Sequence, residues 1–232
     1  MITGLHEERL DAVYRALVHS GARTVLDLGC GEGFLLRRLA GNPRFRTIVG
    51  VDQCGEALWR AREALGEHRQ NPSQRLSVIV GSYADPQLDL HGFDACAMVE
   101  TIEHIHPRTL GKVERAVWGC YRPKTLVLTT PNAEYNVVFG LSSGELREGG
   151  HCFEWDRAKF RRWAAGIAQR NGYCVRLDGI GDHDPRLGQP TQLAVFTRWP
   201  EFGLATLGNN RDSTATPSGA ALPIFRQREE TA

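Results

Sequence analysis

The sequence predicts an α/β fold with a mostly parallel seven-stranded sheet, helices on both faces and an antiparallel hairpin at one edge. Two observations predict it. Apolar segments of strand length alternate with segments of helical periodicity along most of the chain, which is typical of βαβ units in a parallel sheet. The last two strand-like segments, 173–177 and 193–197, have no helical pattern between them, and this favours an antiparallel pair.

The first half of the chain alternates between helix and strand patterns from residue 8 onward. Residues 8–19 predict an amphipathic helix, because apolar side chains recur at helical spacing; these are Leu10, Val13, Tyr14 and Leu17. Strands are then expected at 24–28, 47–51, 76–80 and 93–99, and helices at 34–40 and 56–65.

The second half begins with a helix expected over residues 107–121, since Pro107 suits a first turn. Its expected inner face consists of Leu110, Val113, Val117 and Cys120. A strand over 125–129 is broken by Pro131 and followed by a long loop rich in Gly, Ser and Asn. Asp156 is a suitable N-cap for a helix that ends at Asn171 and Gly172.

The composition is that of an ordinary globular protein. The chain has 232 residues, a formal net charge of +1 and 41% hydrophobic residues, which suits one domain. We expect this domain to cover residues 1–199, because the polar segment 200–232 lacks periodicity and should be disordered. Six cysteines occur without a C-x-x-C pair, which favours reduced, mostly structural thiols and a cytoplasmic location. No signal-peptide pattern and no apolar stretch of membrane-spanning length is recognised, so no membrane partner is expected.

A glycine-rich turn follows the first strand and indicates a ligand site. Asp27 precedes Gly29, Gly31 and Gly33, and the second strand ends at Asp52. Glycines let a ligand approach the backbone at the carboxyl ends of the strands, and a carboxylate at the second strand end suits ribose hydroxyls. The G-x-G-x-G spacing differs from the G-x-G-x-x-G of nicotinamide dehydrogenases. A plain strand-to-helix turn without a ligand is the alternative.

A second group of polar residues follows the fourth strand. On a helical turn, Glu100, Glu103 and His104 would share one face. Two carboxylates and an imidazole there suit an octahedral divalent metal ion such as Mn²⁺ or Mg²⁺. Spacing alone leaves a second interpretation open, in which these are solvated acids beside a stacked histidine.

Several motifs together resemble a known family. V-L-D-L-G-C-G-E-G is similar to motif I of the class I, Rossmann-like methyltransferases, which use S-adenosyl-L-methionine. The segments Glu100-x-x-Glu103-His104-x-His106, Thr129-Thr130-Pro131-Asn132-x-Glu134-x-Asn136 and His151-x-Phe153-Glu154-Trp155 follow in this order. Together they resemble the Hen-type small-RNA 3′-terminal 2′-O-methyltransferases over about residues 21–197. One departure is the run Arg147-Glu148-Gly149-Gly150-His151, which lacks the family's usual acidic residue before the histidine.

The resemblance implies a reaction and a set of site residues. The expected reaction is metal-dependent transfer of a methyl group from S-adenosyl-L-methionine to the 2′-hydroxyl of the 3′-terminal ribose of RNA. The expected catalytic metal ligands are Glu100, Glu103, His104 and His151, and Ser82 is an expected adenine-side contact. His106 is expected at a helix entry or behind the ligands. The partners implied are an RNA 3′ end and RNA-repair proteins.

Two other functions are compatible with the same residues. One is a small-molecule O-methyltransferase acting on a vicinal diol or catechol, and the other is a non-catalytic binding subunit that retains the fold. The first alternative is distinguished from an RNA methyltransferase by assaying methyl transfer to RNA ends that differ only in their terminal hydroxyls. The second is distinguished from an enzyme by measuring whether the chain binds S-adenosylhomocysteine.

Overall fold

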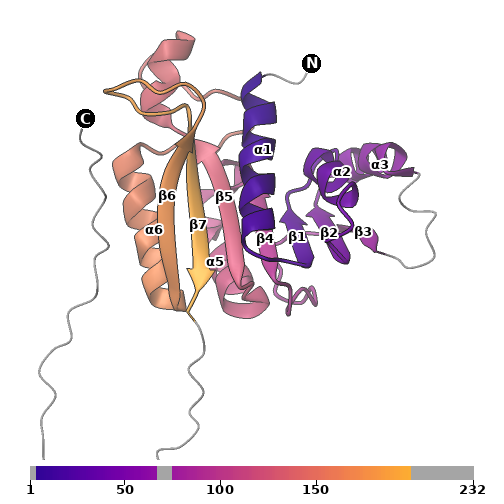
Figure 1. The fold of residues 1–232 in the computed structure, drawn as a ribbon. Coiled ribbons are helices and arrows are strands. Elements are labelled where there is room, and N and C mark those ends of the chain that lie inside the picture. The colour runs from indigo at the N-terminus through magenta and orange to yellow at the C-terminus, as the bar shows by residue number, and fades with distance from the viewer. Residues whose placement is uncertain (1–3, 67–74, 200–232) are drawn as a thin grey trace, which may run out of the picture. The chain divides into compact units, whose positions relative to one another are not determined.

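The computed structural model describes residues 4–66 and 75–199, so the expected tail 200–232 lies outside the described residues. Within the described part, seven strands form one sheet in the order β3-β2-β1-β4-β5-β7-β6 (Figure 1). The strands are β1 (Thr24–Leu28), β2 (Thr47–Asp52), β3 (Leu76–Val80), β4 (Ala95–Val99), β5 (Thr125–Pro131), β6 (Tyr173–Ile180) and β7 (Thr191–Arg198). The helical elements are α1 (Gly4–His19), α2 (Phe34–Ala40), α3 (Gly55–Ala64), η1 (Ile102–His104), η2 (Pro107–Thr109), α5 (Leu110–Glu114), η3 (Arg115–Tyr121), η4 (Ala133–Phe139) and α6 (Arg157–Asn171).

The strand directions confirm the expected fold class. Strands β1 to β5 pair in parallel, and β7 pairs antiparallel with both β5 and β6. The order reverses between β1 and β4, where chain segments leave the sheet on opposite sides. Such a switch point opens a crevice at the carboxyl ends of the strands.

Helices cover the two faces of the sheet and form two apolar layers. Side chains of α1, α2 and α3 pack on one face, where Leu17, Leu36 and Leu58 are fully buried. Side chains of α5, η3 and α6 pack on the other face around Trp118 and Phe196. In Figure 1, α1 runs along β4 and β5 and thereby reaches the upper edge of the sheet. Among the described residues, no helix is both long and apolar enough to cross a membrane.

The helix expected over 107–121 departs from regular α geometry. It begins as the 3₁₀ turn η2, continues as α5 and widens into the π-helix η3. The amide of Arg122 donates to the carbonyl of Val117 over 3.0 Å, which is the longer π-type bond. The wider turn rotates the buried face, so Trp118 and Tyr121 point inward. Cys120, expected on the inner face, is exposed.

The cysteine prediction therefore needs a correction. All six thiols are free, as expected for reduced residues, but only Cys30 and Cys96 are buried. Cys54, Cys120, Cys152 and Cys174 are exposed, because they lie at turns and on outward-facing positions of helices and edge strands. Most of the thiols are therefore not part of the core.

A second departure lies in the segment after β5, where only a loop was expected. Residues Ala133–Phe139 form the helix η4. The Asn132 side chain accepts from the Glu134 amide over 3.1 Å and donates to the carbonyls of Leu187 and Gln189 over 2.8 Å each. Asn132 therefore caps η4 and ties it to the segment before β7.

Candidate functional site

A pocket of about 330 Å³ lies at the carboxyl ends of the parallel strands, and we call it the glycine pocket. It is lined by Gly29, Gly31, Asp52, Gln53, Cys54, Gly81, Ser82, Tyr83, Glu100, Thr101, His104 and Ile105. Four of the residues expected to bind a cofactor are among them, namely Gly29, Gly31, Asp52 and Ser82. The pocket contains the residues directly after β1, β2, β3 and β4, as the switch-point rule predicts.

Asp52 and Gly29 fix the shape of the glycine pocket. One carboxylate oxygen of Asp52 accepts from the Gly31 amide and the other from the Cys54 amide, each over 2.8 Å. Each oxygen keeps a second lone pair that a ribose hydroxyl can use. Gly29 has a φ of +79°, and a Cβ there would lie 2.3 Å from Thr101 Oγ1. Only glycine therefore allows β1 to turn this closely against the segment after β4.

Asp27 and Gly33, the two other residues expected to bind the cofactor, do not line the glycine pocket. The Asp27 side chain is 2% exposed, and its Oδ2 has no hydrogen-bond partner. Burial, followed by the nearby charge of Asp52, raises the pKa of Asp27 to about 7. A Cβ at Gly33 would lie 3.2 Å from the Cβ of Ala61, so Gly33 allows α2 to pack closely on α3.

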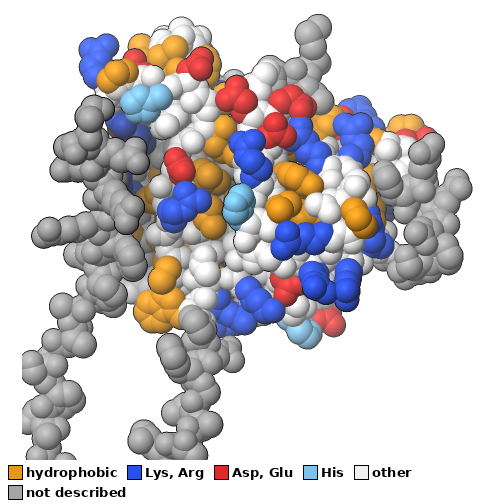
Figure 2. Space-filling view, viewed as in Figure 1, with side chains coloured by type: hydrophobic (Ala, Val, Ile, Leu, Met, Phe, Trp, Pro, Cys, Tyr) orange, Lys and Arg blue, Asp and Glu red, His pale blue; other side chains and the backbone are white. Residues whose placement is uncertain are grey.

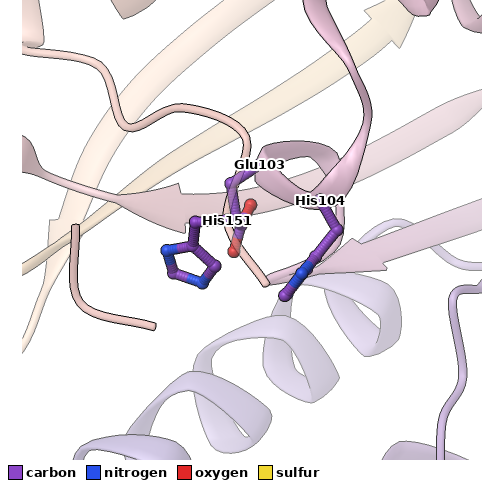
Figure 3. Close-up of side chains that lie close together, drawn as sticks. All are labelled: Glu103, His104 and His151. Atoms are coloured by element: carbon purple, nitrogen blue, oxygen red, sulfur yellow. The ribbon is translucent and has the colours of Figure 1, made fainter. Parts of the chain in front are cut away.

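Three of the expected metal ligands meet beside this pocket. Glu103, His104 and His151 each offer a ligand atom, and these atoms lie within 4.8 Å of one another. We call this group the acid–histidine cluster. Glu103 and His104 come from η1, and His151 comes from the separate loop before α6 (Figure 3). The two imidazoles meet edge to face with ring centroids 4.8 Å apart.

Hydrogen bonds orient all three side chains and leave one ligand atom of each available. Glu154 Oε1 lies 2.6 Å from His151 Nδ1, and the carbonyl of Gly150 lies 3.0 Å from His104 Nδ1, so both Nε2 atoms remain. Thr130 donates to Glu103 Oε2 over 2.9 Å, while Glu103 Oε1 is buried without a partner. Metal-binding side chains in proteins are commonly oriented by hydrogen bonds of this kind from residues that do not touch the metal.

The charges around the cluster also favour a cation. Burial, followed by the charge of Glu100, raises the pKa of Glu103. The carboxylates of the buried Glu103 and the partly buried Glu100 repel each other, and Arg9 offsets part of this repulsion. A bound cation would relieve the rest. The donor set of a carboxylate oxygen and two imidazole nitrogens therefore fits a divalent metal ion.

Glu100, the fourth expected ligand, points its carboxylate to a different partner. Its backbone has a φ of +48°, and its amide donates to the Thr129 carbonyl over 3.2 Å. Its carboxylate forms an ion pair with Arg9 of α1. Burial raises the pKa of Glu100, and the charge of Arg9 opposes this shift. In this arrangement Glu100 borders the cluster but does not join it.

A second pocket, of about 370 Å³, lies on the other side of the cluster, and we call it the histidine pocket. It is lined by Leu5, His6, Arg9, Glu100, His104, Pro131, Phe139, Arg147, Glu148 and His151. Glu100 and His104 line both pockets. Figure 2 shows basic and acidic side chains interspersed over the viewed face rather than gathered by sign. The histidine pocket likewise carries both signs, because Arg9 and Arg147 line it together with Glu100 and Glu148.

Sequence reasoning did not identify several of these residues. Arg9 carried no recognisable signal, because an arginine on the polar face of an amphipathic helix is ordinary. Glu154 was part of the His-x-Phe-Glu-Trp motif, and its spacing from His151 was the available signal for its supporting role.

His106 does not join the cluster. Its Nδ1 accepts from the Arg108 amide over 3.2 Å at the start of η2, which agrees with the expected position at a helix entry.

Known proteins resemble this chain in sequence and in fold. Residues 25–124 match the family model described as a methyltransferase domain. A crystal structure of the methyltransferase domain of bacterial CtHen1 is 38% identical, has a TM-score of 0.75, and is covered over 100% of its length by 84% of this chain. The chain belongs to the Hen1 methyltransferase family. The Hen1 methyltransferase domain thus shares its fold with 84% of this chain.

Other members of the Hen1 family extend the comparison. A small RNA 2′-O-methyltransferase of Rattus norvegicus is 34% identical over 203 residues, which are 84% of this chain and 51% of the rat protein. The chain therefore spans about half the length of this curated relative. The crystal structure of small RNA methyltransferase HEN1 has a TM-score of 0.77 at 30% identity and is covered over 26% of its length. The structure of the Pnkp1/Rnl/Hen1 RNA repair complex, at 23% identity and a TM-score of 0.62, shares the fold.

Proposed function

We propose that the chain transfers a methyl group from S-adenosyl-L-methionine to the 2′-hydroxyl of the 3′-terminal ribose of an RNA. The observation that carries the proposal is that Glu100 and His104 line both pockets. A methyl donor in the glycine pocket and an acceptor in the histidine pocket would then lie on two sides of the same residues. Relatives that are named small RNA 2′-O-methyltransferases support ribose in RNA as the acceptor.

The donor would be held by the residues of the glycine pocket. Gly29 and Gly31 leave the backbone accessible to the methionine part, and Asp52 offers its remaining lone pairs to the ribose hydroxyls. Ser82 lines the same pocket just after β3, and the adenine would lie beside it. Asp27 and Gly33 would act indirectly, through the shape of the loop.

A divalent ion such as Mn²⁺ or Mg²⁺ would be held by Glu103, His104 and His151, with Glu100 joining when its carboxylate leaves Arg9. Bound there, the ion would lower the pKa of a coordinated ribose hydroxyl. The chain's own residues would orient the acceptor. Glu154 keeps the His151 ring in place, and Thr130 does the same for Glu103.

The histidine pocket also supplies charge that suits an RNA end. Arg9 and Arg147 line it, and arginine is well suited to phosphate oxygens. Arg9 would become available to a phosphate when Glu100 turns from it to the ion. Only the 3′-terminal nucleotide of an RNA carries free 2′- and 3′-hydroxyls next to each other. A site that binds both hydroxyls would therefore select the 3′-terminal nucleotide.

An assay with matched RNA ends tests the acceptor. The same short RNA is offered with a 2′,3′-diol, a 3′-phosphate or a 2′-O-methyl group, together with labelled S-adenosyl-L-methionine, chelator and added Mn²⁺ or Mg²⁺. We expect transfer only to the diol end and only with metal. Transfer to a catechol or small diol but to no RNA would contradict the proposal and support a small-molecule O-methyltransferase. Equal transfer with and without chelator would contradict the metal part.

A pair of histidine variants tests the cluster. We expect His151→Ala to abolish metal-dependent transfer and to keep S-adenosylhomocysteine binding, measured by calorimetry. His106→Ala is the matched control, because His106 lies in the same region but does not join the cluster. Full activity in His151→Ala, or an equal loss in both variants, would refute the role of the cluster. RNA-repair proteins stay a predicted class of partner, and co-purification with the full chain tests them.

A further inference from the structure

The C-terminal end of η4 exposes apolar side chains next to the histidine pocket. Val137, Val138 and Phe139 are 62%, 53% and 49% exposed, although large apolar side chains elsewhere in the described chain are mostly buried. The helix itself is well anchored, since Tyr135 and Asn136 are buried and the Asn132 side chain caps it. The exposed apolar side chains therefore project from a helix that is itself held in place by buried residues.

Phe139 differs from its two neighbours because its ring belongs to the histidine pocket. It lines this pocket together with His104 and His151. The Tyr135 ring lies 5.5 Å away at an angle of 54°, and Arg147 Cζ lies 4.8 Å from the ring centroid. The Phe139 ring is thus held by Tyr135 and by the Arg147 guanidinium that lies over it, while the residue as a whole is 49% exposed. Val138 does not line the histidine pocket.

The position of Arg147 strengthens this arrangement. Its Nε donates to Asn136 over 2.7 Å and its guanidinium donates to the Asn132 carbonyl over 2.6 Å. Its backbone amide donates to Glu154 over 2.8 Å. Arg147 thereby connects the Phe139 ring to Glu154, the residue that holds His151. The Phe139 ring and the acid–histidine cluster should therefore keep a fixed relative position.

We propose that the nucleobase of the 3′-terminal nucleotide packs on the Phe139 ring during methyl transfer. The inference rests on the proposed function and names the group that would position the acceptor. If the terminal hydroxyls lie at His104 and His151, the base, which is attached to the carbon next to the 2′-carbon, must lie against a wall of the same pocket. Among the described residues that line this pocket, Phe139 carries the only phenyl ring, and the residue is 49% exposed. Stacking uses the π-face that every base has, so this contact accepts any terminal base.

A comparison of terminal nucleotides with and without a base tests this contact directly. One RNA ends in an ordinary nucleotide, and the other ends in an abasic ribose that keeps the 2′,3′-diol. For Phe139→Ala we expect kcat/KM to fall about 10- to 100-fold on the ordinary RNA and to change less than about twofold on the abasic RNA. Val138→Ala, an exposed apolar neighbour outside the pocket, should change neither value.

The outcomes separate the contact from the proposed function. If Phe139→Ala lowers both rates equally, or if Val138→Ala matches it, the stacking contact is refuted while methyl transfer to RNA stands. If the wild type methylates neither RNA, the proposed function fails and the inference fails with it. A loss of binding to another protein in Phe139→Ala, with unchanged transfer to both RNAs, would mean that the apolar patch is a protein contact.

A binding measurement without turnover provides a second test. An RNA that ends in 2-aminopurine, a fluorescent base, should be quenched when it binds the wild type with S-adenosylhomocysteine. The quenching should be lost in Phe139→Ala and restored in Phe139→Trp, with melting temperatures showing that both variants fold. Equal quenching in wild type and Phe139→Ala would overturn the proposal.

Discussion

Replacing Asp27 with asparagine tests whether its buried carboxyl costs stability at neutral pH. Its side chain is 2% exposed, and one of its oxygens has no hydrogen-bond partner. Burial and the charge of Asp52 raise its pKa from 3.8 to about 7 in the folded chain. The folded state thus binds the proton more tightly than the unfolded state. Stability falls as the pH rises above 3.8, and the full cost is present above about 7.

The size of the effect follows from the two pKa values of Asp27. Between pH 5 and pH 8 the unfolded carboxyl is ionised throughout, whereas the folded one changes from protonated to ionised only near 7. Each pKa unit corresponds to about 1.4 kcal/mol, so the cost grows by on the order of 3 kcal/mol over this interval. The side-chain amide that replaces the carboxyl in the variant does not titrate. We therefore expect the free energy of unfolding of Asp27→Asn, relative to wild type, to rise by roughly this amount from pH 5 to pH 8.

Urea unfolding at pH 5, 6, 7 and 8 without cofactor measures this difference. Asp94→Asn is the control with the opposite shift. Bonds from Lys124 and from the amides of Arg23 and Thr24 lower the pKa of Asp94 to about 2, against its burial. Its contribution to stability is thus lost only as the pH falls from about 4 through 2, and the Asp94→Asn penalty should be constant from pH 5 to 8. A constant difference between Asp27→Asn and wild type over the same interval would refute the reasoning.

Two further predictions concern the glycine pocket and the cluster. Gly29→Ala places a Cβ 2.3 Å from Thr101 Oγ1 at a φ of +79°, so we expect a loss of roughly 3 kcal/mol in urea unfolding. Gly31→Ala, with no atom within 4 Å of its Cβ, should cost only about 1 kcal/mol, and equal losses would contradict this explanation. Glu154→Gln should weaken Mn²⁺ binding about 10- to 100-fold, because His151 loses the carboxylate at its Nδ1. An EPR titration with Mn²⁺ measures this, and unchanged affinity would count against the metal site.

Local patterns in the sequence were sufficient for most of the sheet and for part of the site. Apolar runs predicted the strands, because parallel strands are buried on both faces and leave a strong signal. Glu103, His104 and His151 were predicted from their motif and do meet in the structure. The pairing of Arg9 with Glu100 was beyond sequence reasoning, because it depends on how α1 lies across the sheet.

The two misjudged segments have a shared physical reason. The helix over 107–121 has an α-like pattern, but the π-turn that rotates its last residues depends on packing around Trp118. Helix η4 lacks strong periodicity, and it exists because the Asn132 side chain bonds both the helix start and the distant segment before β7. Both features are decided by tertiary contacts, which outweigh local preference.

The ion pair between Arg9 and Glu100 has a practical consequence for shortened versions of this chain. Helix α1 looks dispensable for chemistry, because it precedes the glycine turn and mainly packs on the sheet. A fragment that begins after α1 would nevertheless leave Glu100, which lies beside the buried Glu103, without the arginine that pairs with it. Such a fragment would be expected to bind divalent cations differently from the full chain even if its sheet still folds. Divalent-cation affinities measured on such a fragment would therefore not apply to the full chain.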